Sequence, residues 1–264
     1  MPPSLSIIIP ACNEEKRIPY ILKSYSDYFN KLEREKLIKY KILIVINNTK
    51  DRTEEIVKDF SKKNKNIKYN VLIPGGKGFA VLEGFKHELE NNSSQLIGFV
   101  DADLSTPPEA FYDLVKKIKG HGSAIASRYV KGAIVKPKQK IQRIISSRMF
   151  NVVTRALLFV NYRDTQCGAK LFTRKSLKII IPQLTFSKWA FDIDILYTLK
   201  KNEIPVIEVP TTWIERKFST INFFNAGSFM VLGIIRLRLL NSPLKDFIRL
   251  YDFLITRIRK YLLP

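Results

Sequence analysis

Short apolar runs alternate with helical patterns along the first half of the chain. Segments around 16–32, 51–63, 78–91 and 107–119 carry apolar residues at helical spacing. Strands that alternate with helices favour a parallel sheet with helices on both faces. The pattern therefore predicts an α/β fold with a doubly wound, mostly parallel sheet. Five runs have the length and composition of buried strands: 5–9, 42–46, 69–73, 96–100 and 123–127.

The second half of the chain combines structural patterns with a strong basic charge. Residues 128–163 predict a basic amphipathic helix, and 170–172 and 206–209 predict two more strands. The net charge is +21, with 20 basic and 16 acidic residues through residue 120 and 25 basic and 8 acidic residues after it. No acidic residue lies between Asp113 and Asp164. The expected partner of this half is anionic: a nucleic acid, an acidic membrane surface or a phosphorylated substrate.

The composition narrows the range of expected partners. The basic residues are interleaved with aliphatic residues more than with stacking aromatics, so we expect no nucleic-acid partner. A lysine-rich solvated surface is the alternative explanation for many of the lysines, but it accounts less well for the gap in acids. Cys12 and Cys167 lie far apart without paired spacing, which is typical of a reducing compartment.

The C-terminal segment has the pattern of an amphipathic helix. Apolar residues recur at helical spacing over 244–262, with Lys and Arg on much of the other side. Ser242 and Pro243 are typical of the cap and first position of such a helix. The segment 223–240 just upstream is also unusually apolar. These C-terminal amphipathic helices suit a membrane interface, and packing on the protein's own domain or on a partner subunit is the alternative.

Two carboxylates follow the apolar run 96–100. The sequence there reads IGFVDADLSTPP and includes Asp101, Ala102 and Asp103. Ligands of open α/β sheets bind at the carboxyl ends of the strands. Two carboxylates at that place suit Mg²⁺ or Mn²⁺ shared with a phosphate. The alternative is a plain turn in which Asp103 caps a helix that starts near Pro107.

Polar loops after the other predicted strands face the same edge of the sheet. They are 10–14 (PACNE), 47–51 (NNTKD) and 75–78 (GGKG). Glycines let backbone N–H groups approach a phosphate, and Lys77 adds a positive charge. The spacing is not that of a P-loop, and alone these glycines favour a plain loop. Together with the two aspartates, they predict a site for a nucleotide diphosphate and a metal.

A metal-dependent phosphatase is an alternative for the aspartate pair. In phosphatases of the haloacid-dehalogenase type, the pair follows the first strand, with Thr or Val two residues after the second Asp. Here the pair follows the fourth strand, and Ser105 occupies that position. The order of elements disfavours this alternative.

Three segments of the second half are more specific than the aspartate pair. They are 163–174 (RDTQCGAKLFTR), 188–192 (KWAFD) and 204–209 (IPVIEV), followed by Trp213. Through them the chain resembles the family 2 glycosyltransferases of GT-A fold, and within these the dolichyl-phosphate β-glucosyltransferase branch, over nearly its whole length. The resemblance implies a GT-A catalytic domain over 1–217, followed by membrane-interface helices over 218–264. The catalytic domain would have a nucleotide-sugar half of about 1–127 and an acceptor half of about 128–217.

The resemblance assigns donor-site roles to residues of the first half. Asp101 and Asp103 match the motif that binds the metal and the diphosphate. The resemblance and the loop 75–78 together give the residues expected to bind the nucleotide sugar. They are Pro10, Asn13, Glu14, Asn47, Lys77, Gly78, Asp101, Ala102 and Asp103.

The resemblance assigns acceptor-site roles to residues of the second half. Arg128, Arg143 and Ser147 match positions that hold the lipid phosphate in related polyprenyl-phosphate sugar synthases. Asp192 matches the acidic position near the transferred sugar. The expected catalytic residues are therefore Asp103, Asp192 and Arg128.

Two departures from the family pattern concern the nucleotide. Asn47 and Asn48 stand where the family usually has two aspartates, although an Asn carbonyl still accepts a hydrogen bond from a uracil N–H. The segment 216–220 (RKFST) lacks the family's Gly-Ser-Lys. We expect Arg216 or Lys217 to neutralise the leaving diphosphate, with a surface role as the alternative.

The resemblance implies inverting transfer of a hexose from a nucleotide sugar to dolichyl or another polyprenyl phosphate. UDP-glucose is the favoured donor, and N-acetylglucosamine and mannose remain open. The expected location is the cytoplasmic face of a membrane, as a peripheral or monotopic protein. The alternative is a hydroxyl acceptor, for which Asp192 would serve as the base.

Overall fold

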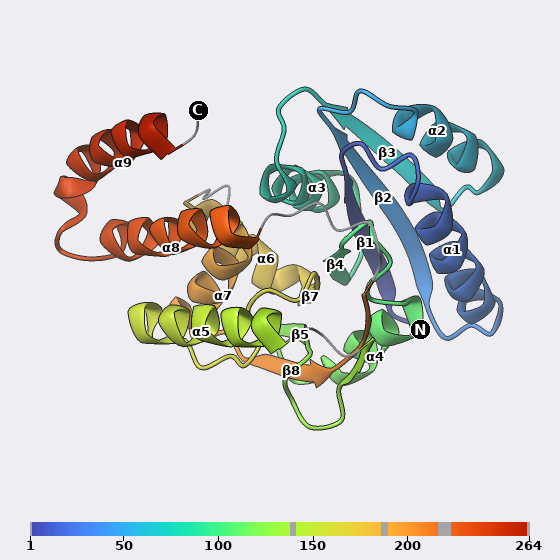
Figure 1. Ribbon diagram of the computed structural model, residues 1–264. Coiled ribbons are helices and arrows are strands. Elements are labelled where there is room, and N and C mark those ends of the chain that lie inside the picture. The colour runs from blue at the N-terminus through green and yellow to red at the C-terminus, as the bar shows by residue number, and fades with distance from the viewer. Residues whose placement is uncertain (1, 138–140, 186–189, 216–222, 263–264) are drawn as a thin grey trace.

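The computed structural model describes residues 2–137, 141–185, 190–215 and 223–262. Its central sheet has seven strands in the order β3-β2-β1-β4-β7-β5-β8 (Figure 1). Strand β7 runs antiparallel to both of its neighbours, and the other pairs are parallel. The predicted mostly parallel α/β fold is confirmed. The strands are β1 (Ser4–Ala11), β2 (Lys39–Asn47), β3 (Ile67–Leu72), β4 (Leu96–Val100), β5 (Ser123–Ser127), β7 (Ala169–Thr173) and β8 (Val206–Pro210).

Helices bury both faces of the sheet, which explains why its central strands are apolar runs rather than alternating patterns. One face packs against α1 (Ile18–Arg34), α2 (Thr53–Lys63) and α4 (Pro108–Lys117). On this face the ring of Tyr25 contacts that of Phe111. The opposite face packs against α3 (Lys77–Asn91), α6 (Arg174–Ile180) and α7 (Phe191–Lys201).

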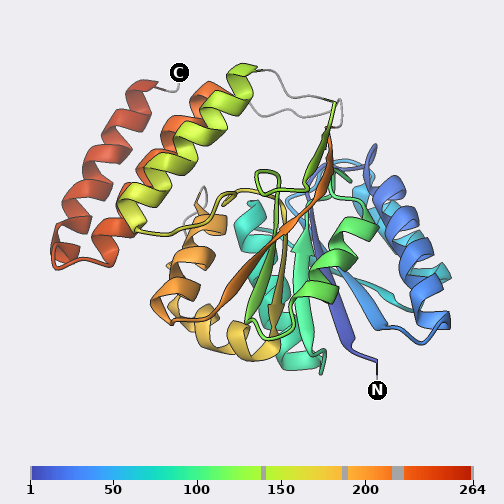
Figure 2. The same ribbon diagram turned by 90° about the horizontal axis from the view of Figure 1, so that it is seen from below.

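Three further helices form a layer beside α7. They are α5 (Ile141–Leu158), α8 (Phe223–Leu240) and α9 (Ile248–Leu262), and Figure 2 shows them side by side. Ile234 and Leu237 of α8 are buried against α5 and the start of α7. Arg236 and Asp252 form an ion pair at 2.8 Å that joins α8 to α9. Within the described ranges, no helix is both long and apolar enough to cross a bilayer.

The helix predicted over 128–163 is shorter than its pattern suggests. It begins at Ile141, and the strand β6 (Ile134–Lys136) lies within the predicted range. Strand β6 pairs in parallel with β9 (Thr212–Ile214) in a separate two-stranded sheet. Gly132 has φ +95°, and Pro137 lacks the N–H that a helix interior requires, so helical structure cannot continue through this segment.

The last helix also begins later than its sequence signals indicate. The Ser242 hydroxyl accepts a hydrogen bond from Leu244 N at 3.1 Å, as a helix cap does. However, the chain then forms a short 3-10 helix, η2 (Lys245–Phe247), with backbone bonds from residue i+3 to residue i, and α9 begins only at Ile248. A second 3-10 helix, η1 (Ile181–Gln183), follows α6.

Candidate active site

Asp101 lies directly after β4, at the carboxyl end of the sheet. Its backbone N–H donates to Gly168 O at 3.0 Å, which extends the pairing of β4 with β7 by one step. A Cβ on Gly168 would lie 2.0 Å from Asp101 Oδ2. The Asp101 carboxylate therefore occupies the space that any side chain at 168 would need, and a larger residue there would force the carboxylate to move.

Asp103 belongs to the turn after β4 rather than to the cap of α4. Its Oδ1 accepts a hydrogen bond from Ser105 N at 2.9 Å, which is an Asx turn. Helix α4 begins at Pro108 with Pro107 at its cap position, and no side chain caps it. The alternative in which Asp103 caps this helix is therefore wrong.

The two aspartates fit a divalent cation that is shared with a phosphate. Two carboxylates supply hard oxygen ligands of the kind that Mg²⁺ and Mn²⁺ prefer. Among the described residues, no cluster of three or more His, Cys, Asp or Glu side chains could enclose a metal by itself. A cation held by Asp101 and Asp103 would therefore complete its coordination with water and substrate oxygens.

Four side chains of alternating charge extend from Asp101 into the protein. Lys77 Nζ lies 2.7 Å from Asp101 Oδ1 and 3.6 Å from Asp192 Oδ2. Lys170 Nζ lies 2.6 Å from Asp192 Oδ1 and donates to Cys167 O at 2.8 Å. We call Asp101, Lys77, Asp192 and Lys170 the charge row.

The charge row gives its two carboxylates different acidities. Burial raises the pKa of Asp101 above its usual value, and the opposing charge of Lys77 does not fully offset this. Burial acts on Asp192 in the same direction, but the charges of Lys170 and Lys77 outweigh it and lower the pKa of that carboxyl. Asp192 is therefore a stable anion at neutral pH.

Close packing between two helix starts assembles the charge row. A Cβ on Gly78 would lie 2.7 Å from the Cβ of Phe191, so the first turn of α3 rests directly on the first turn of α7. This contact places Lys77 beside Asp192. The N-terminus of α7 also favours the negative charge of Asp192.

The loops after β1 and β2 are joined by hydrogen bonds. Asn13, with φ +54°, accepts from Lys50 N at 2.8 Å, and Glu14 N donates to Thr53 Oγ1 at 2.7 Å. The Glu14 carboxylate makes two contacts with Arg17, at 2.5 and 2.7 Å. Asn13 and Glu14 thus fix the shape of the rim at which the nucleoside was expected.

Asn47 is almost completely buried at the end of β2. Its Nδ2 donates to Gly76 O at 3.2 Å, which ties this strand to the loop before α3. The next residue, Asn48, is exposed and has φ +49°. Pro10 is buried at the same edge, within β1. The Asn47 amide therefore holds the loop 75–78 in place through its Nδ2 group.

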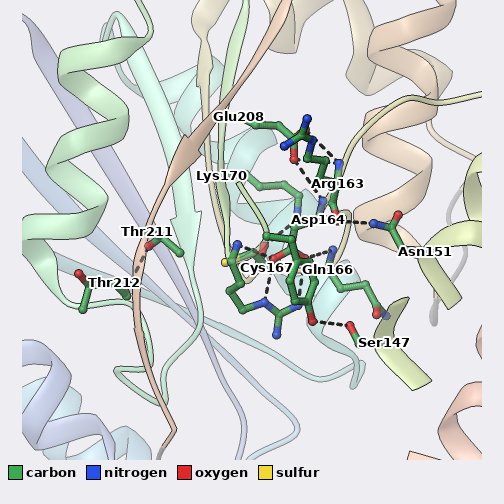
Figure 3. Close-up of polar contacts among 12 residues, drawn as sticks. Ser147, Asn151, Arg163, Asp164, Gln166, Cys167, Lys170, Glu208, Thr211 and Thr212 are labelled. Atoms are coloured by element: carbon green, nitrogen blue, oxygen red, sulfur yellow. Dashed lines mark hydrogen bonds and ion pairs between the residues drawn. The ribbon is translucent and has the colours of Figure 1, made fainter. Parts of the chain in front are cut away.

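Arg128 follows β5 and forms a two-pronged ion pair with Asp164, which Figure 3 labels. Its Nε and Nη2 donate to the two Asp164 oxygens at 2.8 and 2.9 Å, and its backbone N–H donates to Oδ2 at 2.9 Å. The Arg128 side chain is 10% exposed and the Asp164 side chain is 2% exposed. The Glu208 carboxylate, on β8, accepts the N–H groups of Arg163 and Asp164 and so fixes the loop that carries Asp164.

The Tyr129 side chain contacts Arg128 and Ser147 of the expected acceptor site, and also Arg148. Its hydroxyl donates to Ser147 Oγ at 2.9 Å, and the Arg128 and Arg148 guanidinium carbons lie 5.3 and 5.7 Å from its ring centroid. The structure thus brings Arg128 and Ser147 together around one aromatic ring. Arg143 lies in α5, but its side chain is outside the described residues.

The model of glycosyl transferase family 2 matches residues 6–180. The chain belongs to this family. The predicted family is confirmed, and the protein is a glycosyltransferase.

Relatives of this glycosyltransferase share most of its length. A dolichyl-phosphate beta-glucosyltransferase of Dictyostelium discoideum is 33% identical over 245 residues, which are 89% of this chain and 73% of the relative. A protein of the same name from Trichomonas vaginalis is 32% identical over 217 residues, 80% of this chain and 66% of the relative. The human dolichyl-phosphate beta-glucosyltransferase is 29% identical over 258 residues, 90% of this chain and 76% of the relative. The chain thus spans about two thirds to three quarters of these relatives.

Solved structures share the fold of this glycosyltransferase at low sequence identity. Glucosyl-3-phosphoglycerate synthase from Mycobacterium tuberculosis, crystallised with Mn²⁺, UDP and phosphoglyceric acid, superposes with a TM-score of 0.63 at 17% identity, over 90% of this chain and 78% of that one. The TarS protein of S. aureus superposes with a TM-score of 0.56 at 19% identity, over 91% and 66%.

Sequence reasoning missed several side chains of this glycosyltransferase site. Lys170 and Asp164 both lie in the segment 163–174, which the sequence marked as specific without assigning these two a role. A lysine inside the otherwise apolar strand AKLFT was the available signal for a buried ion pair. Arg148 and Tyr129 carried no comparable signal. Expectations for Arg216 and Lys217 lie outside the described residues, as do Lys188 and Trp189 of the segment KWAFD.

Proposed function

We propose that the protein transfers glucose from UDP-glucose to dolichyl phosphate, with inversion at the anomeric carbon. Its relatives from Dictyostelium, Trichomonas and human carry the name dolichyl-phosphate beta-glucosyltransferase. The superposed glucosyl-3-phosphoglycerate synthase is solved with Mn²⁺ and UDP-glucose. Both observations support a glucosyl donor activated by UDP.

The ion pair of Asp192 with the fully buried Lys170, at 2.6 Å, is the observation that carries the choice of acceptor. A general base works best when its pKa lies near the working pH. Lys170 and Lys77 hold the pKa of Asp192 below its usual range, which makes it a poor base. A hydroxyl acceptor needs a base to remove its proton, whereas a phosphate oxygen is already an anion near neutral pH. The site therefore favours a phosphate acceptor, and the names of the relatives point to a lipid phosphate.

The donor side of the site would support departure of the nucleotide. Asp101 and Asp103 would hold Mg²⁺ or Mn²⁺, which when bound neutralises charge on the leaving diphosphate. Lys77 lies beside Asp101 and is 40% exposed, so its ammonium group is within reach of the same phosphates. Asp192 accepts hydrogen bonds and would orient the hydroxyl groups of the transferred sugar.

The acceptor side would hold the lipid phosphate at the edge of the layer formed by α5, α8 and α9. Arg128 is fixed by Asp164, and Ser147 and Arg148 lie around the same Tyr129 ring. We assign the lipid phosphate to this group, completed by Arg143. Two anionic substrates repel each other, so fixed positive charge is what the protein must supply.

Exposed apolar side chains on the helix that carries Ser147 and Arg148 favour a membrane surface as partner. Helix α5 exposes Ile145, Met149 and Val152, which are spaced along one face. Near the end of the chain, Phe247 in η2 and Leu250 in α9 are exposed as well. Arginines near these residues suit anionic lipid headgroups.

The placement of the two cysteines supports the cytoplasmic side of the membrane. Cys12 is exposed and Cys167 is buried, and both are free thiols. Free thiols are typical of a reducing compartment. We therefore place the protein on the cytoplasmic face.

The test uses the purified protein with dolichyl phosphate in detergent, Mn²⁺ or Mg²⁺, and a labelled donor. UDP-glucose, UDP-N-acetylglucosamine and GDP-mannose are offered in turn. We expect label from UDP-glucose in a lipid that mild acid cleaves, with a β linkage by NMR. Asp101→Ala should abolish transfer, and Arg143→Ala should raise the KM for the lipid more than the KM for the donor. Absence of labelled lipid with every donor would overturn the proposal, as would equal labelling of dolichol that lacks its phosphate.

A further inference from the structure

We propose that Lys77 is an exchangeable counter-ion, which pairs with Asp101 until a divalent cation binds and then turns to the diphosphate. This inference rests on the proposed function, because it requires a metal and a nucleoside diphosphate at the aspartate pair. It adds a coupling device to that site, in which one lysine links binding of the metal to binding of the nucleotide.

The first step is the competition for Asp101. Lys77 Nζ lies 2.7 Å from Asp101 Oδ1, at one of the two carboxylates that suit the metal. A cation that binds at Asp101 Oδ1 competes with this ammonium group, because the two positive charges repel each other at contact distance. The exposed fractions of the two side chains are 40% and 35%, so Lys77 can leave without crossing packed protein.

The second step concerns what Lys77 leaves behind. Its other partner is Asp192, at 3.6 Å. Asp192 keeps a closer cation in Lys170, at 2.6 Å, whose side chain is fully buried and cannot follow Lys77. Movement of Lys77 therefore leaves neither carboxylate unpaired: the metal neutralises Asp101, and Lys170 neutralises Asp192.

The third step is the place to which Lys77 turns. Lys77 is the first residue of α3, after Gly76 with φ +124°. A Cβ on Gly76 would meet nothing within 4 Å, so space is open on that side of the loop. Unpaired N–H groups at a helix start favour a phosphate. The displaced ammonium group would thus meet the diphosphate at the start of its own helix.

The consequence is coupling between two ligands. In the free protein, Lys77 opposes metal binding at Asp101. In the nucleotide complex, the same lysine is engaged by the diphosphate and no longer opposes it. Each ligand should therefore strengthen the other, and by linkage the two effects are equal in size.

The test measures Mn²⁺ affinity by the EPR signal of the free ion, with and without saturating UDP, in the wild type and in Lys77→Met. Removal of the lysine should tighten Mn²⁺ binding to the free protein by about fivefold or more. In the presence of UDP the affinity should change little, because Lys77 has already left Asp101 in the wild type. Lys86→Met is the matched control, since Lys86 pairs with Glu83 on the exposed side of the same helix.

The outcomes separate this inference from the proposed function. Unchanged Mn²⁺ affinity in the free Lys77→Met protein would overturn the exchange. An equal gain with and without UDP would also overturn it, because it would reflect only the loss of a nearby positive charge. A wild-type protein that binds neither Mn²⁺ nor UDP would instead refute the proposed donor site.

Discussion

The side chain of Lys170 is fully buried in the central sheet, and its Nζ lies 2.6 Å from Oδ1 of Asp192. A second bond, to Cys167 O at 2.8 Å, fixes the ammonium group from the other side. Its Nζ also lies 5.5 Å from the centroid of the Phe99 ring. A buried ammonium group with such partners holds one carboxylate in one position and in one charge state.

Removal of this buried ammonium group should therefore cost both stability and activity. Lys170→Met keeps most of the side-chain volume but leaves Asp192 with Lys77 as its cation, at 3.6 Å. We expect the free energy of unfolding to fall by about 3 kcal/mol, the usual range for breaking a buried pair from one side. Urea denaturation measures this change, and Lys175→Met on the exposed surface of α6 is the matched control.

The double variant Lys170→Met with Asp192→Leu separates charge from packing. Replacing both partners removes the unpaired carboxylate, so part of the lost stability should return. Transfer should not return, because Asp192 itself is missing. A double variant that is no more stable than Lys170→Met would show that packing, rather than the ion pair, determines the loss.

The alternation of apolar and helical segments was sufficient to predict the strands of the sheet, because burial on both faces requires continuous apolar runs. The antiparallel insertion of β7 between β4 and β5 was not predictable from such a pattern, since each strand reads alike in either direction. The three-residue strands β6 and β9 are too short to show a period. Local spacing cannot reveal such long-range pairings.

In the candidate site, too, local patterns were predictable and long-range contacts were not. Asp101 and Asp103 could be predicted to lie together because both follow one strand, where position in the chain determines position in space. Arg128 and Asp164 are 36 residues apart, and their ion pair depends on how β5 packs beside the loop before β7. The sequence pointed to Arg128 by resemblance alone and gave no indication of its buried partner.

A methyl group at position 168 should disrupt the aspartate pair. Gly168→Ala places a Cβ 2.0 Å from Asp101 Oδ2, so the carboxylate must move. We expect a loss of about 1–3 kcal/mol in the free energy of unfolding, typical of overpacking, and a large loss of Mn²⁺ affinity. Thermal unfolding and EPR measure the two effects.

A second substitution tests whether that loss comes from the carboxylate. Asp101→Ala in the Gly168→Ala background removes the clashing atoms, so stability should recover relative to Gly168→Ala alone. No recovery would place the strain in the backbone at 168 instead. Normal Mn²⁺ affinity in Gly168→Ala would contradict the assignment of Asp101 as a metal ligand.

The planar guanidinium group of Arg128 should matter more for use of the lipid phosphate than its positive charge alone. Arg128→Lys keeps a positive charge but cannot make both bonds to Asp164, because an ammonium group lacks the planar fork. We expect the KM for the lipid phosphate to rise by about tenfold or more, with a smaller change in the KM for the donor. Steady-state kinetics with each substrate varied in turn measure this. Arg155→Lys, at an exposed pair with Asn161, is the control and should change neither value.

The pH dependence of transfer distinguishes a phosphate acceptor from a hydroxyl acceptor. Asp192 has a pKa below its usual value, so as a base it would stay ionised and active across the whole neutral and mildly acidic range. A phosphate monoester loses its second proton near pH 6, and its dianion is the better nucleophile. We expect kcat/KM for the lipid to rise with pH through a midpoint near pH 6, measured at saturating Mn²⁺ so that protonation of Asp101 does not contribute. Asp192→Asn should lower the rate but leave this midpoint in place. A rate that shows no midpoint near pH 6, and that falls only in the acidic range typical of an aspartate, would identify Asp192 as the base if this fall disappears in Asp192→Asn, and would return the acceptor to a hydroxyl.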